Sequence, residues 1–309
     1  MGSWGVNGGE SARDGETAPT IGDWVRLLRV HQWIKNFFVL APLLFSGRAN
    51  EGSAVLAACV VFVAFCLLSS CVYILNDAAD READRAHPTK RNRPLASGRL
   101  TLGAGLGAAF VLGSAGLAFA FGLNSTAGLI GASYLGLNVL YSLYLKRVVI
   151  LDVFSLAGFF LLRLLAGSAA VEVTPSVWLL LCGGLLALYL GFAKRRHELS
   201  LMKDNSVTHR KVLEHYSPMF LDQMSVVLLS VTIVSYIMYT LVSDTAVAVR
   251  SGALLLSTVF VLYGVFRYLY LVHQQDGGSP TETLLTDRAL LVNILLWLTY
   301  CGWVIYQPF

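Results

Sequence analysis

Four Asn and Asp side chains that can bind a cation lie within nine residues of this chain, in the stretch NDAADREAD. They are Asn76, Asp77, Asp80 and Asp84. On a helix continuing from the preceding apolar run, these spacings project all four side chains to one face. Like charges at such spacings repel, and a bound cation would relieve the repulsion. Because oxygen ligands without His or Cys suit Mg²⁺, which usually takes further ligands from substrate phosphates, we expect a magnesium site for a phosphate ester.

A basic loop follows the acidic residues directly. Its positive side chains are His87, Lys90, Arg91, Arg93 and Arg99. Pro88 and Pro94 favour an extended backbone there, and Arg and Lys are the usual phosphate-binding side chains. A simpler alternative is a solvated loop in which the Asp residues pair with Arg81 and Arg85. The acids begin at the end of an apolar run, where unpaired charge is costly, so we favour a combined metal and phosphate site.

Two further charged segments lie between apolar runs. The first, YSLYLKRVVILD, contains Tyr141, Lys146, Arg147 and Asp152. The second, GFAKRRHEL, contains Lys194, Arg195, Arg196 and Glu198. The second is also typical of a stop-transfer cluster, which needs no function. If all three charged loops lie on one membrane face, they form a single anion-binding mouth.

Three charged residues are expected within apolar surroundings. Asp152 and Arg163 are three helical turns apart, so they share a face but are separated by about 16 Å of helix rise. We expect both to face a polar cavity inside the bundle. Lys35, in WIKNFF, is a candidate phosphate ligand, although an interfacial Lys with its ammonium group at the membrane surface is the simpler interpretation.

The elements that position these residues are predicted to be membrane helices. The chain is 56% hydrophobic and 14% charged, against about 25% charged in an ordinary soluble domain. Apolar runs near the ~20 residues that cross a bilayer recur along it. They are 27–46, 53–75, 102–122, 126–145, 150–171, 176–193, 220–242, 250–272 and 288–307. We therefore predict an all-α polytopic bundle of about nine transmembrane helices, with residues 1–22 as a disordered tail and 23–309 as a single transmembrane catalytic domain.

Lys and Arg predict the orientation of the bundle. Of the 23 Lys and Arg residues, only Arg48 and Arg250 fall in the loops expected on one side, and Arg163 lies within a span. The positive-inside rule then places the N-terminus and the charged loops in the cytoplasm, and the chain in the inner (plasma) membrane as a multi-pass protein.

Five stretches carry a likeness to a known family. WIKNFFVLAPL, NDAADREADRAHPTKRNRP, YSLYLKRVVILD, LLRLLAGSAA and AKRRHEL resemble the UbiA superfamily of membrane prenyltransferases, and within it the decaprenyl-phosphate phosphoribosyltransferases. The likeness covers about residues 25–215 in order. The acidic motif is typical of the whole superfamily, whereas the other charged stretches favour the phosphoribosyl branch. The C-terminal third departs from that pattern.

The resemblance implies a reaction. A UbiA-like enzyme of this branch transfers 5-phosphoribosyl from 5-phosphoribosyl diphosphate (PRPP) to a polyprenyl phosphate such as decaprenyl phosphate, releases diphosphate, requires Mg²⁺ and serves cell-envelope polysaccharide synthesis. The acidic motif would be the metal and diphosphate site. The basic residues implied as phosphate contacts are Lys90, Arg91, Lys146, Arg163, Lys194 and Arg195. We expect no nucleic-acid partner, and assembly into a homo-oligomer stays open.

The chemistry predicts further roles and leaves alternatives. The lipid phosphate is already anionic and needs no strong base, so Asp152 is expected to orient the ribose hydroxyls or the metal. Direct displacement should invert the configuration at the anomeric carbon. An aromatic prenyltransferase that uses a prenyl diphosphate is one alternative. A second Asp four residues from Asp152 would favour it, but positions 148 and 156 are Val and Leu. A membrane transporter is another, although its charges should be spread through the membrane depth.

Overall fold

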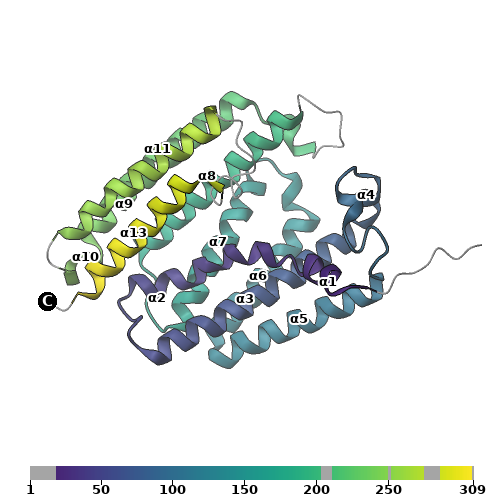
Figure 1. Cartoon of the computed structure of the whole chain (residues 1–309), viewed down its shortest axis with the longest axis horizontal. Helices are drawn as coiled ribbons and strands as arrows, with labels where there is room; N and C mark the ends of the chain where they lie inside the picture. Colours follow the sequence, from purple (N-terminus) through teal and green to yellow (C-terminus); the bar gives the residue numbers. More distant parts are fainter. Residues whose placement is uncertain (1–18, 203–210, 250–251, 275–285, 308–309) are drawn as a thin grey trace, which may run out of the picture.

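The computed structural model describes residues 19–202, 211–249, 252–274 and 286–307. Every regular element in these residues is helical (Figure 1). Eight helices of the described chain are long and apolar enough to cross a membrane. They are α3 (Gly52–Ala79), α5 (Leu102–Leu123), α6 (Ser125–Leu143), α7 (Leu151–Ala170), α8 (Val177–Met202), α9 (Pro218–Val242), α11 (Thr258–Gln274) with the preceding 3₁₀ turn η5 (Ala253–Ser257), and α13 (Arg288–Tyr306). The predicted all-α membrane bundle is confirmed.

The segment expected as the first span, residues 27–46, has a different form. It consists of the end of α1 (Ile21–Leu28), an eleven-residue 3₁₀ helix η1 (Val30–Leu40) and the short α2 (Ala41–Phe45). Arg29 separates α1 from η1 with a left-handed backbone, φ 50°. Pro42, which has no amide hydrogen, lies in the first turn of α2, where a helix tolerates its absence. This series of short helices replaces a continuous ninth span.

The start of α1 has a local sequence signal. Thr20 is its N-cap residue, and its hydroxyl donates to Asp23 Oδ2 at 2.7 Å while accepting from the Asp23 amide. The hydrogen bond from the Thr20 side chain is the main reason that the pKa of Asp23 is lowered. Residues 1–18 of the expected tail 1–22 lie outside the described residues, and the helix begins before the expected end of that tail.

Small residues allow the helices to approach closely. A Cβ added at Gly116 of α5 would lie 2.9 Å from the Leu68 side chain of α3, and one at Gly113 would lie 3.1 Å from Cys71 Sγ. In α7, a Cβ at Gly167 would overlap the main-chain carbonyl of Val39 in η1. The glycines therefore set how near η1 and α5 lie to the helices that carry the charged residues.

The charged loops gather at one end of the bundle. They contain α4 (Arg81–Ala86) and three 3₁₀ turns, η2 (Lys90–Asn92), η3 (Leu145–Arg147) and η4 (Lys211–His215). Lys146 of η3 lies 3.7 Å from Asp80, next to α4, and η3 also contacts η4. α4 is at the right of Figure 1, whereas α2, α10 (Asp244–Val249) and the end of α13 are at the left.

The opposite end is tied together by a few polar contacts. Arg48 pairs with Glu51 and donates to the carbonyl of Val171 after α7. The Tyr306 hydroxyl of α13 accepts a 3.0 Å hydrogen bond from the Ala49 amide. Within the described part of the chain, the two ends are thus chemically different, and the expected site residues belong to the other end and to the interior.

Candidate active site

The acidic stretch lies where α3 ends. Asp80 has φ −91° and ψ 5° and separates α3 from α4, so the four predicted ligands do not lie on one uninterrupted helix. Helix-like hydrogen bonds still cross the break, from the Asp80 amide to Asn76 O at 2.9 Å and from the Asp84 amide to Asp80 O at 2.8 Å. Asp80 therefore ends the continuous helix that was expected, although the helical hydrogen-bond pattern runs through it. The side chains divide into two pairs with different partners.

Asp77 and Asp84 form the first pair, around a single guanidinium group. Arg93 Nη1 lies 3.0 Å from Asp77 Oδ1 and 2.6 Å from Asp84 Oδ2. Both Asp residues are only 3% exposed. Arg29 also pairs with Asp77, and its guanidinium lies 5.0 Å from the centre of the Tyr73 ring. Two carboxylates from α3 and α4 therefore converge on one positive nitrogen.

Asn76 and Asp80 form the second pair and face the junction of α6 and η3. Ser142 Oγ donates to Asn76 Oδ1 at 2.6 Å. Lys146 Nζ lies 3.7 Å from Asp80 Oδ1, and the Asp80 side chain is half exposed. The expected proximity of Lys146 to the acidic motif is therefore present in the structure.

The donor chemistry of the first pair fits a divalent cation. In residues 19–202 and the other described ranges, no three His, Cys, Asp or Glu side chains converge as a cluster ready to hold a metal. Asp77 Oδ1 and Asp84 Oδ2 nevertheless lie within 3.0 Å of the same cationic nitrogen. Carboxylate oxygens that already converge on one positive charge are the ligands that Mg²⁺ requires. Asn76 and Asp80, one turn away, carry two further oxygen donors.

The arginines and lysines at the basic loop 87–99 are of two kinds: some hold the loop backbone in place, and others remain exposed. Arg81 Nε and Arg85 Nε donate to the carbonyls of Leu95 and Ala96, each at 3.1 Å. The alternative in which these two arginines neutralise the Asp residues is thus not what the structure contains. The exposed basic side chains at η2 are Lys90 and Arg91. They are the loop residues best placed to meet an anion from solution.

Asp152 is buried in an ion pair instead of facing a cavity. Asp152 and Arg195 are both 0% exposed, and Arg195 Nε lies 2.6 Å from Asp152 Oδ2. Tyr216, just before α9, donates from its hydroxyl to Asp152 Oδ1 at 2.8 Å. Arg195 Nη1 also pairs with Glu198 at 2.6 Å. These contacts join α7, α8 and the η4 segment, so they favour a positioning role for Asp152 and Arg195.

Arg163 lies in the centre of the bundle among neutral partners. Its Nε donates to Asn36 Oδ1 at 2.7 Å, and its Nη2 donates to the Tyr134 hydroxyl at 3.0 Å. Lys35 precedes Asn36 in η1 and is partly buried. The structure therefore places Lys35 and Arg163 on two segments that pack on each other, η1 and α7, whereas Asp152 contacts α8 and the residues after η4.

The two remaining expected residues occupy the walls of this region. The ring of Tyr141 packs on Phe159 with centroids 5.7 Å apart. Lys194 lies on α8 next to Arg195, and Arg196 pairs with Asp222 of α9 at 3.1 Å. Sequence analysis did not identify the residues that contact these charged groups. They are Arg29, Asn36 as the hydrogen-bond acceptor of Arg163, Tyr134, Ser142 and Tyr216. They lie far along the chain from the groups they contact, and no local pattern marks them.

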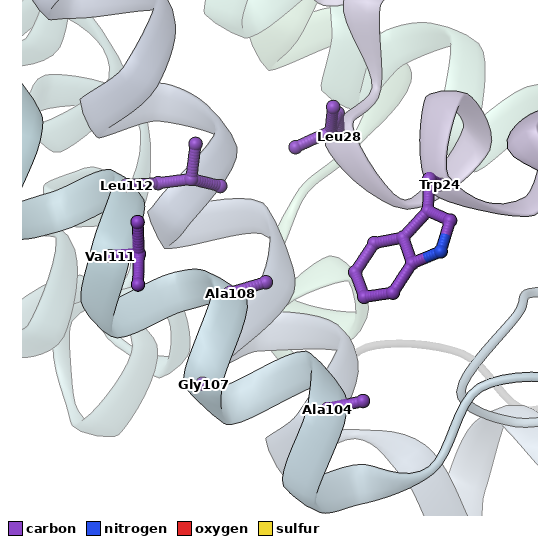
Figure 2. A pocket seen from close by; sticks show the side chains of 7 residues that line it. All are labelled: Trp24, Leu28, Ala104, Gly107, Ala108, Val111 and Leu112. Carbon is purple, nitrogen blue, oxygen red and sulfur yellow. The ribbon is translucent and has the colours of Figure 1, made fainter.

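An apolar groove lies beside this end of the bundle, between α1 and α5 (Figure 2). Its volume is about 410 Å³. The lining residues are Trp24, Leu28, Ala104, Gly107, Ala108, Val111 and Leu112. Because these side chains are apolar, the groove suits hydrocarbon and not phosphate. It adds no charged group to the site.

Comparison with known proteins settles the family. The model of the UbiA prenyltransferase family matches residues 36–298. The chain belongs to the UbiA prenyltransferase family. It is accordingly a transferase enzyme with a membrane helical bundle.

Relatives of this UbiA protein share most of its length. It is 32% identical to a decaprenyl-phosphate phosphoribosyltransferase of Mycolicibacterium smegmatis, over 91% of this chain and 92% of the relative. It is 31% identical to the protein of that name from Corynebacterium glutamicum, over 88% and 83%. A UbiA homologue from Archaeoglobus fulgidus, bound to GPP and Mg²⁺, superposes with a TM-score of 0.68 at 18% identity, covering 92% of this chain and 100% of that one. This last likeness shows the shared fold.

Proposed function

We propose that this UbiA protein transfers a 5-phosphoribosyl group from PRPP to a polyprenyl phosphate, such as decaprenyl phosphate, and releases diphosphate. The convergence of Asp77 and Asp84 on one positive charge at the charged end carries the proposal, because it provides the oxygen ligands for Mg²⁺. The names of the relatives that share about 30% identity support the donor and the acceptor. The product would serve the synthesis of cell-envelope polysaccharides on the cytoplasmic side of the plasma membrane.

The protein's own residues would divide the work between binding and orientation. Mg²⁺ held by Asp77 and Asp84, with Asn76 and Asp80 as further oxygen donors, would neutralise charge on the departing diphosphate. Lys90 and Arg91 are exposed at η2 and would bind phosphate oxygens, and Lys146 would do so beside Asp80. Lys194, on α8 two residues before the Arg196–Asp222 pair, is a further candidate contact.

The displacement itself would need no strong base. The acceptor phosphate is anionic, so its oxygen can attack the anomeric carbon directly. The C–O bond to diphosphate breaks at the same time, and the diphosphate leaves with the bonding electron pair. Charge that develops on the ribose resembles an oxocarbenium ion, as in glycosyl transfer generally. Asp152 and Arg195 hold α7 and α8 in register around the reacting groups. A single displacement inverts the anomeric configuration, and retention in the product would contradict this scheme.

A transfer assay with purified protein tests the proposal. We expect radiolabel from PRPP to enter the lipid phase with polyprenyl phosphate and Mg²⁺ but not with EDTA. Asp84→Asn, which keeps the volume and removes the charge, should lower the rate at least ~100-fold. Glu82→Gln is a matched control on the same helix, because Glu82 is exposed and pairs only with the neighbouring Arg85.

A second donor separates this function from its closest alternative. The same preparation is incubated with a prenyl diphosphate and an aromatic acceptor. Prenylation of the aromatic compound, with no label transferred from PRPP, would replace the proposed function by aromatic prenyl transfer.

A further inference from the structure

Arg163 carries a positive charge into the bundle core without an acidic partner. It is 4% exposed, and three hydrogen bonds of its guanidinium end on neutral groups: the Asn36 amide oxygen, the Phe159 carbonyl at 2.9 Å and the Tyr134 hydroxyl. Arg remains charged at any ordinary pH. A buried charge with no counter-charge is costly, above all within a membrane. An anion bound here would remove that cost.

Lys35 adds a second positive charge at the same place. It precedes Asn36, whose amide oxygen accepts a hydrogen bond from Arg163, and its helix η1 packs on α7, which carries Arg163. Among the described residues, no carboxylate pairs with Lys35 or Arg163. Two neighbouring like charges repel, and an anion between them would be attracted by both positive charges.

This cation pair lies deeper than the acidic site. The Asn36 amide donates to Ser69 Oγ of α3 at 3.2 Å. Ser69 precedes Asp77 by eight residues, which corresponds to about 12 Å of helix rise. Arg29 connects the two levels, because the Leu28 carbonyl just before it accepts a hydrogen bond from Ser70, while its side chain pairs with Asp77. Positive charge thus extends from the acidic site into the bundle. The inner positive residues, Lys35 and Arg163, are the ones that no described carboxylate pairs with.

The geometry points to Lys35 and Arg163 as a separate subsite for the phosphate of the lipid acceptor, an inference that rests on the proposed function. In a direct displacement, acceptor and leaving group lie on opposite sides of the anomeric carbon. The diphosphate leaves on the side of Asp77 and Asp84, so the acceptor oxygen approaches from the inner side. A separation of about 12 Å along α3 leaves room for a pentose between the two anions. The new bond forms to a phosphate oxygen that Lys35 and Arg163 hold.

Binding of two short ligands, measured without the donor, tests the subsite. Farnesyl phosphate and farnesol share their hydrocarbon chain. The Kd of farnesol divided by the Kd of farnesyl phosphate therefore isolates the contribution of the phosphate. We expect Lys35→Gln to lower this ratio about tenfold, because a hydrogen bond to a charged group is removed. Arg147→Gln, which removes an exposed positive charge from η3, should leave it unchanged. PRPP affinity should change less than twofold in both variants.

The outcomes separate the subsite from the reaction. An unchanged ratio in Lys35→Gln would overturn the subsite. A loss of PRPP affinity as large as the loss for farnesyl phosphate would also overturn it, because the pair would then bind a phosphate of the donor. If the ratio falls as expected but the wild-type protein transfers no label from PRPP, the subsite stands and the proposed function fails.

Discussion

Arg93 occupies the position between Asp77 and Asp84 that a divalent cation would need. Its Nη1 contacts one oxygen of each carboxylate, so Arg93 would compete with a metal ion for the same ligands. Arg93→Gln should destabilise the protein by about 3 kcal/mol in EDTA, because a buried Asp84 loses its partner. Mg²⁺ should then raise the unfolding temperature of the variant more than that of the wild type, since binding no longer has to displace the guanidinium. Thermal unfolding in detergent measures both effects.

Arg91→Gln is the control for this measurement. Arg91 lies two residues before Arg93 in the same loop and is exposed. It should unfold near the wild-type temperature in EDTA. An Arg93→Gln protein that Mg²⁺ stabilises no more than it stabilises the wild type would show that arginine and metal do not compete.

Residue types could be predicted here, but partners could not. The sequence identified Asp77 and Asp84 as a site with several arginines nearby, and Arg81 and Arg85 are the closest of them along the chain. The structure pairs Asp84 with Arg93 and directs Arg81 and Arg85 to main-chain carbonyls. The choice depends on how the loop folds back over buried Leu95 and Ala96. That is a tertiary property which spacing does not encode.

At the scale of elements, hydrogen bonds of Tyr216 connect the η4 segment to the start of α7. Its hydroxyl donates to Asp152 and accepts from the amide of Ile150, a β-branched residue with φ 70°. Such a backbone conformation is strained and needs support from its surroundings. Tyr216→Phe should therefore cost about 2 kcal/mol, because Ile150 N–H and Asp152 each lose a partner.

The pH dependence of this loss has a definite sign. Burial is the main cause that raises the pKa of Tyr216 to about 12, above the value of about 10 in an unfolded chain. The contribution of the hydroxyl is complete below pH ~10 and disappears as pH rises toward the folded value. The difference in unfolding free energy between wild type and Tyr216→Phe should hence stay constant from about pH 6 to 9. A difference that changes within that range would assign the titration to another group.

Element boundaries followed from the sequence to within a few residues for several long apolar runs. The span expected at 53–75 is α3, Gly52–Ala79, and that expected at 220–242 is α9, Pro218–Val242. Residues 27–46 are less apolar, because Lys35 and Asn36 interrupt the run, and they form η1 and its neighbours. The left-handed backbone of Arg29 and the close approach of η1 to Gly167 decide that form. Neither is visible in hydrophobicity.

At the scale of the molecule, the two ends of the bundle should face different compartments. We expect the end with η2 and η3 to be cytoplasmic. In a background without native cysteines, Ser97→Cys should resist a membrane-impermeant thiol reagent in intact cells and react after lysis. Asn50→Cys, exposed near Arg48 at the opposite end, should react in intact cells. The reverse labelling pattern would invert the proposed orientation.

Gly167 has a consequence for altering this enzyme by design. Its missing side chain lets the main chain of η1 lie directly on α7, four residues from Arg163. The spacing of the two main chains that carry Lys35 and Arg163 is therefore set by backbone against backbone. A library aimed at a bulkier acceptor head group should keep position 167 fixed and randomise Tyr134 and Phe160 instead, since their rings flank the guanidinium of Arg163.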